Sequence, residues 1–275
     1  MAAMLIDKDT QLCISLSEKP SNFGCTVHNA AFQARGLNFL YKAFGVYDIE
    51  NALKGVRALG IRGCGVSMPF KEAVIQYLEE VEPIAQEIGA VNTVVNDGSR
   101  LTGYNTDWEG AVNAISDAYD VKNKEVVLIG AGGAARAIGF GLVRTRVKEL
   151  RIINRTDERG RELADRLGAT FVPWCWLSLI GGDLLINATP VGMVPNTEIT
   201  VVNADVMAKF QAVFDVVASP LITRMVEKAR GLGLLAIAGY KMSLHQAAKQ
   251  FELYTHCDAP LDVMEESLRQ YLLRD

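Results

Sequence analysis

The feature that most constrains the fold is a regular alternation of short apolar runs with longer amphipathic runs, which begins near Lys124. This alternation is typical of repeated βαβ units, in which crossover helices join parallel strands. Strands are expected at 125–129, 150–153, 170–172, 184–186, 213–217 and 234–237, and helices at 134–146, 156–167 and 221–230. The pattern therefore predicts an α/β domain with a doubly wound parallel sheet.

The preceding part of the chain is also mixed α/β, but its alternation is less regular. Helices are expected at 26–35 and 49–59, and strands at 39–46, 65–67, 92–95 and 101–104. The last two strands flank Asn96-Asp97-Gly98-Ser99, a good hairpin turn. The tail at 242–273 is helical, and we expect it to pack back on the first domain. A chain of 275 residues is long enough for two cores, and the helix at 108–119 is the candidate boundary.

Composition excludes several classes of protein. A net charge of −4 with 22% charged residues provides no basic surface for nucleic acid. The five cysteines are scattered without a CxxC pair, and His28, His245 and His256 are equally dispersed, so neither disulfides nor a metal site are expected. The start, MAAMLIDKDTQLC, is unlike a targeting signal, and no stretch approaches the roughly 18 apolar residues of a membrane span. A cytoplasmic protein without membrane contact is predicted.

A glycine-rich loop joins the first strand of the doubly wound domain to its first helix. Gly130-Ala131-Gly132-Gly133-Ala134-Ala135 fits the GxGxxA pattern of dinucleotide-binding turns. The glycines permit a tight turn and let a pyrophosphate approach the N–H groups at the start of the helix. A purely structural glycine turn is the alternative, but the flanking βαβ units favour a dinucleotide.

The end of the second strand, Asn154-Arg155-Thr156, indicates which dinucleotide. NAD-binding domains usually place an acid here to accept from the ribose hydroxyls, whereas an arginine suits the 2′-phosphate of NADP. Arg159, one turn further on, can pair with the same phosphate, although a solvated helix start is its alternative role. NADP is therefore predicted. Asp157 can repel the phosphate or accept from an unphosphorylated ribose, so NAD stays open as a weaker alternative.

Polar residues also follow apolar runs in the first domain, in GVSMPFK at 65–71, GAVNT at 89–93 and GYNTD at 103–107. Strand ends of this kind open onto binding clefts. A lysine and an aspartate that meet there, Lys71 and Asp107, can share the proton of a substrate hydroxyl. Spacing alone leaves an ordinary surface role as the alternative for both.

Taken in order, these motifs resemble those of the shikimate dehydrogenases over nearly the whole chain. The resemblance rests on GVSMPFKE, GAVNT, GYNTD, GAGGAAR, NRT, NATPVGM, PLIT and GxxMxxxQA. It implies a substrate-binding catalytic domain at 1–108, an NADP-binding Rossmann domain at 109–240, and C-terminal helices at 241–275 packed on the substrate domain.

The resemblance also implies an activity. The family transfers a hydride reversibly between NADP and a ring hydroxyl of shikimate, giving 3-dehydroshikimate in the chorismate pathway of aromatic amino-acid biosynthesis. Oxidation of quinate or aminoshikimate is the alternative within the family. A non-catalytic NADP-binding redox sensor is the alternative of another class, and the presence of both Lys71 and Asp107 argues against it.

Carried over residue by residue, the resemblance implies three groups of site residues. Lys71 and Asp107 are the catalytic pair. The substrate-binding residues are Ser15, Ser17, Ser67, Asn92 and Gln246. The cofactor-binding residues are Gly130, Ala131, Gly132, Gly133, Ala134, Ala135, Asn154, Arg155, Thr156, Arg159, Thr189, Met193, Gly239 and Met242. The expected partner is a small cyclic polyol acid, with no nucleic acid, membrane or metal, and the protein is expected to be a monomer or homodimer.

Several positions depart from the family pattern. Ile14 replaces a common histidine, Ser67 stands where threonine is usual, and Ala218 stands where the family commonly has a tyrosine able to bond the substrate. Loss of one good hydrogen bond to a charged group costs about 1.5–3 kcal/mol, roughly ten- to hundredfold in affinity. The sequence is therefore that of a divergent member, slow on shikimate or turned toward a related substrate.

Overall fold

The computed structural model describes residues 6–98 and 100–274, so the first five residues, Ser99 of the predicted turn and Asp275 lie outside it. The chain divides into two compact units. The first comprises Met1–Thr106 and Gln246–Tyr271, and the second comprises Asp107–His245 and Leu272–Asp275. The first boundary falls where helix α4 (Asp107–Ser116) begins, and the second lies within α9 (Tyr240–Thr255).

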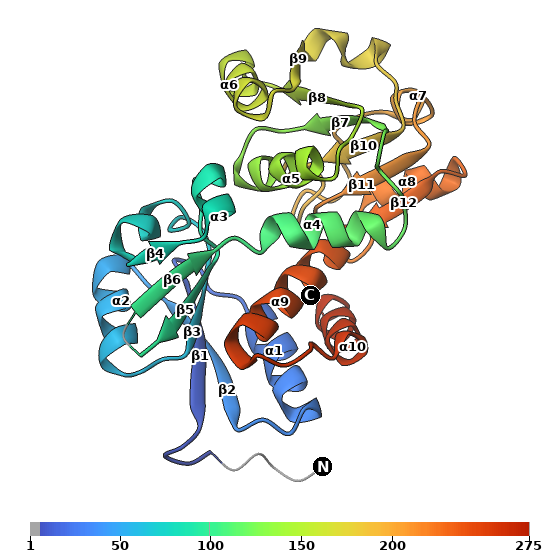
Figure 1. The fold of residues 1–275 in the computed structure, drawn as a ribbon. Helices are drawn as coiled ribbons and strands as arrows, with labels where there is room; N and C mark the ends of the chain where they lie inside the picture. The colour runs from blue at the N-terminus through green and yellow to red at the C-terminus, as the bar shows by residue number, and fades with distance from the viewer. Residues whose placement is uncertain (1–5, 99, 275) are drawn as a thin grey trace. The chain divides into compact units, whose positions relative to one another are not determined.

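The first unit contains a mixed six-stranded sheet with the order β2-β1-β3-β5-β6-β4 (Figure 1). β1 runs parallel to β2 and β3, whereas β5 is antiparallel to β3 and β6. β1 and the two-residue β4 have no counterpart among the predicted strands. The strands are β1 (Gln11–Ser17), β2 (Phe39–Gly45), β3 (Gly63–Val66), β4 (Glu80–Val81), β5 (Thr93–Asp97) and β6 (Arg100–Tyr104).

Helices pack on both faces of this sheet. One face carries an aliphatic core that includes Leu53 and Val74, and the other carries aromatic contacts such as Phe32 with Phe251, whose ring centroids are 5.5 Å apart. Most of the C-terminal helices, Gln246–Tyr271, belong to this unit; the Arg62 guanidinium, for example, donates to the Tyr254 carbonyl at 2.8 Å. The helices are α1 (Phe23–Ala34), α2 (Ile49–Ala58), η1 (Ala73–Tyr77), α3 (Pro83–Ile88), most of α9 and α10 (Leu261–Leu272).

The second unit confirms the predicted doubly wound sheet. All six strands are parallel, in the order β12-β11-β10-β7-β8-β9. Successive residues of β7 point to opposite faces, so Leu128 joins one buried cluster and Ile129 the other. The strands are β7 (Glu125–Ile129), β8 (Glu149–Asn154), β9 (Thr170–Pro173), β10 (Leu184–Asn187), β11 (Ala212–Asp215) and β12 (Leu235–Ala238). The remaining helices are α5 (Gly133–Arg144), α6 (Asp157–Leu167), η2 (Trp174–Leu179), α7 (Ala204–Met207) and α8 (Arg224–Gly231).

The start of α8 corrects one prediction. The sequence pattern places this helix at 221–230, but it begins at Arg224. Thr223 caps it, because its hydroxyl accepts from the Val226 N–H at 3.3 Å and donates to the buried Asp215 carboxylate at 2.6 Å. Because this cap depends on a hydrogen bond to Asp215, at the end of a strand eight residues upstream, a local sequence pattern cannot predict it.

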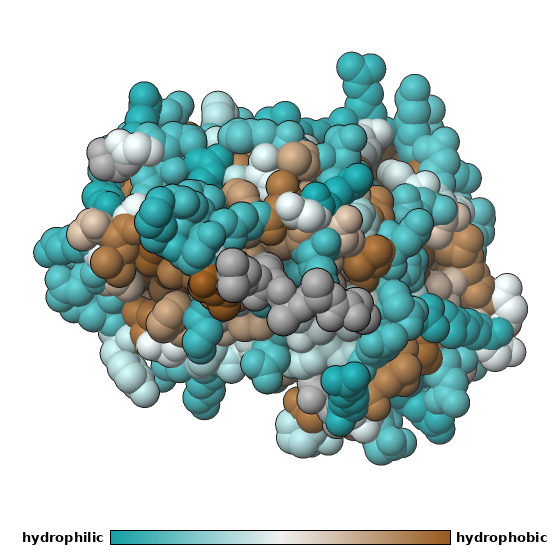
Figure 2. Space-filling view, turned by 90° about the horizontal axis from the view of Figure 1, so that it is seen from below, coloured by the Kyte–Doolittle hydropathy of each residue, from teal (hydrophilic) through white to brown (hydrophobic). Residues whose placement is uncertain are grey.

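The outer surface mixes side chains of both kinds. On the face shown in Figure 2, hydrophilic side chains predominate and hydrophobic ones lie between them in smaller groups. None of the helices in residues 6–98 and 100–274 is both long enough and apolar enough to cross a membrane.

Candidate cofactor and substrate sites

The loop between β7 and α5 has the geometry of an anion-binding turn. Gly130 has φ +120°, and a Cβ there would lie 2.9 Å from the Ala188 carbonyl oxygen, so only glycine fits. At Gly132 and Gly133 an added Cβ would meet nothing within 4 Å, so this side of the loop is open. Among the residues that the structure describes, none caps the start of α5 with its side chain. The N–H groups of its first turn can therefore bind a phosphate.

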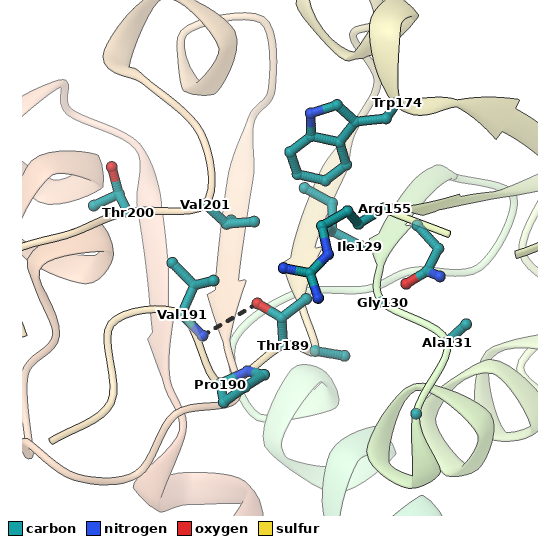
Figure 3. Close-up of a pocket in the computed structure, with 13 residues that line it drawn as sticks. Ile129, Gly130, Ala131, Arg155, Trp174, Thr189, Pro190, Val191, Thr200 and Val201 are labelled. Carbon is teal, nitrogen blue, oxygen red and sulfur yellow. Dashed lines mark hydrogen bonds between the residues drawn. The ribbon is translucent and has the colours of Figure 1, made fainter. Parts of the chain in front are cut away.

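A pocket of about 470 Å³ lies beside this loop, at the carboxyl ends of β7, β8 and β10 (Figure 3). β7 and β10 flank the point where the strand order of the sheet reverses, which is where doubly wound domains bind nucleotides. The pocket is lined by Ile129, Gly130, Ala131, Gly132, Asn154, Arg155, Trp174, Ala188, Thr189, Pro190, Val191, Thr200 and Val201.

Arg155 extends from the end of β8 into this pocket. Its guanidinium lies between the Trp174 ring and Thr189 (Figure 3). The Asn154 side chain donates to the Thr156 carbonyl at 2.8 Å and thereby closes the turn that carries Arg155. The pocket thus combines an open phosphate-binding loop with a cationic side chain, as a phosphorylated dinucleotide requires.

Asp157, the residue that could favour NAD over NADP, has a cationic partner. The Arg161 guanidinium lies 3.7 Å from the Asp157 carboxylate, one helical turn away, and over the Phe171 ring at 4.4 Å. Both members of the pair are exposed, so the pair is weak, but it reduces the negative charge near Arg155. The i, i+4 spacing of these residues is the sequence signal for this pair.

The loop after β10 is held by a buried polar network. The Asn187 side-chain oxygen accepts from the Thr189 N–H at 3.0 Å and from its hydroxyl at 2.6 Å. The Asn187 amide donates to the Asp215 carboxylate at 2.9 Å and to the Val191 carbonyl at 3.2 Å. Asp215 is fully buried, and this burial raises the pKa of its carboxyl group. The network fixes the wall of the pocket that NATPVGM forms.

The predicted cofactor residues fall into two groups. Those that line the pocket are Gly130, Ala131, Gly132, Asn154, Arg155 and Thr189. Those outside its lining are Gly133, Ala134, Ala135, Thr156, Arg159, Met193, Gly239 and Met242. Ala135 and Met242 belong to the core of the second unit. Lining residues absent from the predicted set, such as Pro190, Thr200 and Val201, are apolar or lie in irregular loops, which leaves no chemical signal in the sequence.

Four of the five predicted substrate residues lie at one end of neighbouring strands in the sheet of the first unit. Ser15 and Ser17 lie on β1, Ser67 follows β3, and Asn92 precedes β5. Ser15 pairs with Gly65, the Ser67 N–H donates to the Leu16 carbonyl at 3.0 Å, and the Val66 N–H donates to the Asn92 carbonyl at 2.7 Å. Three segments far apart in the sequence therefore place these four polar side chains at neighbouring strand ends.

The remaining predicted residues occupy three different segments. The Lys71 carbonyl accepts from the Val91 N–H at 2.8 Å, which places the backbone of Lys71 beside the GAVNT segment. Asp107 opens α4 in the second unit, directly after Thr106. Gln246 lies in the part of α9 that belongs to the first unit. Lys71, Asp107 and Gln246 are all partly buried.

Comparison with known proteins covers both units. A family model described as "Shikimate dehydrogenase substrate binding domain" matches residues 22–94, and one described as "Shikimate / quinate 5-dehydrogenase" matches residues 112–220. A third, "Shikimate 5'-dehydrogenase C-terminal domain", matches residues 239–269.

Individual relatives match along almost their whole length. The chain is 44% identical to a shikimate dehydrogenase-like protein of Haemophilus influenzae, over 92% of this chain and 93% of the relative. It is 42% identical to a shikimate dehydrogenase (NADP(+)) of Moorella thermoacetica, over 89% of this chain and 87% of the relative.

Solved structures agree with this relationship. A shikimate 5-dehydrogenase-like protein superimposes with a TM-score of 0.91 at 41% identity, covering 98% of this chain and 100% of that one. The shikimate dehydrogenase of Thermus thermophilus in complex with NADP(H) and shikimate gives a TM-score of 0.86 at 32% identity, covering 94% of this chain and 99% of that one. From its motifs, its fold and these matches, the chain belongs to the shikimate dehydrogenase family.

Proposed function

We propose that this protein is an NADP-dependent shikimate dehydrogenase that oxidises a ring hydroxyl of shikimate reversibly to 3-dehydroshikimate, in the chorismate pathway of aromatic amino-acid biosynthesis. The observation that carries the proposal is the pocket at the switch point of the second sheet, where Gly130–Gly132, Arg155 and the loop after β10 meet. Relatives across 86% or more of this chain are named shikimate dehydrogenase (NADP(+)), which supports the same activity.

The residues of the second unit suit NADP. The open side of the glycine loop and the start of α5 would bind the pyrophosphate, and Arg155 would bind the 2′-phosphate. Thr189 would line the path toward the nicotinamide. When bound, NADP supplies the hydride acceptor, and the protein supplies orientation and proton transfer.

The residues of the first unit suit a small hydroxylated acid. We assign the substrate carboxylate to Ser15 and Ser17, and the ring hydroxyls to Ser67, Asn92 and Gln246. Lys71 would accept the hydroxyl proton as the carbinol C–H leaves as a hydride, and would return it in the reverse direction. Asp107 would orient the substrate through its carboxylate. A positioned acid–base of this kind contributes roughly 10²–10⁴ in rate.

Ala218 keeps a second candidate open within the family. Alanine cannot donate the hydrogen bond that a tyrosine at this position offers, so quinate or aminoshikimate oxidation is the alternative activity.

Five cysteines without disulfides support a reducing, cytoplasmic setting. The expected oligomeric state is a monomer or homodimer.

A steady-state assay tests the proposal. Initial rates are measured with shikimate, quinate and aminoshikimate, each with NADP and with NAD. We expect the highest kcat/KM for shikimate with NADP. A higher kcat/KM for quinate or aminoshikimate would transfer the assignment to that substrate. If NADP binds but none of the three is oxidised, the protein is a binding protein and not a dehydrogenase.

A further inference from the structure

A buried chain of hydrogen bonds in the first unit leads from α1 to one of the predicted substrate residues. His28 Nε2 lies 3.3 Å from Gln250 Oε1, and Gln250 Nε2 donates to the Thr93 hydroxyl at 2.9 Å. The Thr93 hydroxyl donates to Asn92 Oδ1 at 2.8 Å. All four residues are at most 4% exposed. Water is therefore excluded from this chain, and each bond is stronger than it would be at the surface.

The direction of the bond between His28 and Gln250 is fixed. Gln250 Nε2 also donates to the Asn92 carbonyl at 3.2 Å, and a carbonyl cannot accept from Oε1, so the Gln250 amide has one possible orientation. His28 must then donate through Nε2. Among the described residues His28 Nδ1 has no hydrogen-bond partner, as suits a bare nitrogen, and burial lowers the pKa of His28 to about 4. The imidazole is therefore neutral and is a donor to Gln250.

The far end of the chain sets the orientation of Asn92. Asn92 Oδ1 accepts from both the Thr93 hydroxyl and the Thr106 N–H, the latter at 2.8 Å. Asn92 Nδ2 donates to the Thr106 hydroxyl at 3.1 Å. Because the oxygen accepts from these two donors, the amide nitrogen is fixed on the other side of the Asn92 side chain. Its orientation matters, since a hydroxyl-binding amide must present a defined donor or acceptor.

His28 also supports a second predicted substrate residue. Its ring stacks on the Tyr41 ring, with centroids 4.5 Å apart and planes inclined by 13°, and the Tyr41 hydroxyl lies next to Gly65, which pairs with Ser15 in the sheet. Gly65 leaves room for both branches. A Cβ at Gly65 would lie 2.8 Å from the Tyr41 hydroxyl and 3.5 Å from Gln250 Nε2.

We propose that His28 and Gln250 are positioning residues for substrate binding, which orient Asn92 through Thr93 and pack the Tyr41 ring beside Ser15. The inference rests on the proposed function, because it assigns Asn92 and Ser15 to the substrate. A purely structural role would make these residues ordinary core residues, whose loss lowers stability without changing the KM for the substrate selectively.

The first test compares two substitutions on α9. Gln250→Met keeps the length of the side chain and removes its hydrogen bonds, and Phe251→Leu disturbs the packing of the next, fully buried residue. We expect Gln250→Met to raise the shikimate KM about tenfold, with kcat and the Kd for NADP within about threefold, because uniform substrate binding is lost. Phe251→Leu should lower stability and leave the KM unchanged. Equal KM values for both variants and wild type would overturn the proposal.

A second pair of variants, at Thr93, tests the proposal independently in case Gln250→Met misfolds. Thr93→Val is nearly isosteric and interrupts the chain, whereas Thr93→Ser keeps the hydroxyl. We expect Thr93→Val to raise the KM about tenfold and Thr93→Ser to stay within about threefold of wild type. Equal effects of valine and serine would overturn the relay through Thr93.

The two levels of proposal fail differently. If wild type oxidises shikimate or a related polyol acid while both relay variants keep its KM, only the positioning role is wrong. If wild type neither oxidises nor binds any of these acids, the proposed function is wrong and the positioning role is wrong with it.

Discussion

Replacement of Arg155 by alanine is the perturbation whose effect on cofactor choice can be estimated from the pocket. The guanidinium extends between Trp174 and Thr189, and Arg155 lines the same pocket as the glycine loop. A charge-assisted hydrogen bond to a phosphate contributes about 1.5–3 kcal/mol. Since about 1.4 kcal/mol is a factor of ten, Arg155→Ala should weaken NADP binding by roughly 10- to 150-fold. NAD lacks the 2′-phosphate, so its affinity should change by less than about twofold.

Calorimetric titration of NADP and NAD into wild type and variants measures this effect. Arg159→Ala is the matched control, because Arg159 lies on the same helix start but outside the pocket lining, and we expect it to weaken NADP only slightly. The double variant should lose at least about tenfold for NADP alone. Replacing Asp157 should, if anything, sharpen the preference for NADP, and its pair with Arg161 keeps that effect small. Equal losses of NADP and NAD affinity on Arg155→Ala would show that the arginine supports the fold and does not bind the phosphate.

Substitutions at five further positions have expected outcomes. Lys71→Ala should lower turnover by about two to four decades, and Asp107→Asn should also lower it severely, with the fold intact by circular dichroism; an active alanine variant would exclude Lys71 from proton transfer. Burial lowers the pKa of His28 from 6.5 to about 4, so as the pH falls His28 is protonated in the unfolded chain before it is protonated in the folded protein. The free energy of unfolding should therefore drop by about 2 kcal/mol between pH 7 and pH 5. His28→Gln should abolish that decrease in urea unfolding, and an unchanged decrease would contradict the assignment. Asp215→Ala should be less stable than Asp215→Asn by about 1–3 kcal/mol, because alanine leaves the buried amide and hydroxyl partners of the carboxylate without an acceptor; equal unfolding free energies would refute this. Ala218→Tyr should lower the shikimate KM by roughly ten- to hundredfold while Ala218→Phe does not, and equal KM values would show that the hydroxyl has no role.

The parallel sheet of the second unit could be predicted closely from the sequence. Its central strands β7, β10 and β11 are buried on both faces, so each is a short apolar run, and β7 spans the expected residues 125–129. The start of α8 could not be predicted, because Thr223 depends on Asp215 at the end of another strand. In the first unit β1 has no counterpart among the predicted strands, although the apolar residues of Gln11–Ser17 and the polar segments on both sides of it are typical of a strand.

The candidate sites also contain some residues that could be predicted from the sequence and others that could not. The glycine loop and Arg155 line one pocket. Both could be located from the sequence because the βαβ pattern predicts the strand ends that carry them. The contact between His28 and Gln250 joins residues 222 positions apart, which no local pattern encodes. Thr200 and Val201 line the pocket from an irregular loop, so residue type offers no clue to their position.

Transfer of an isotopic label tests the central claim most directly. Shikimate that carries deuterium at the reacting carbinol carbon is incubated with the protein and NADP, and both products are analysed by mass spectrometry. The proposed function predicts 3-dehydroshikimate without the label and reduced NADP that carries it, with no transfer by Lys71→Ala on the same timescale. Reduced NADP without deuterium, or no reduction of NADP by wild type, would contradict direct hydride transfer from shikimate.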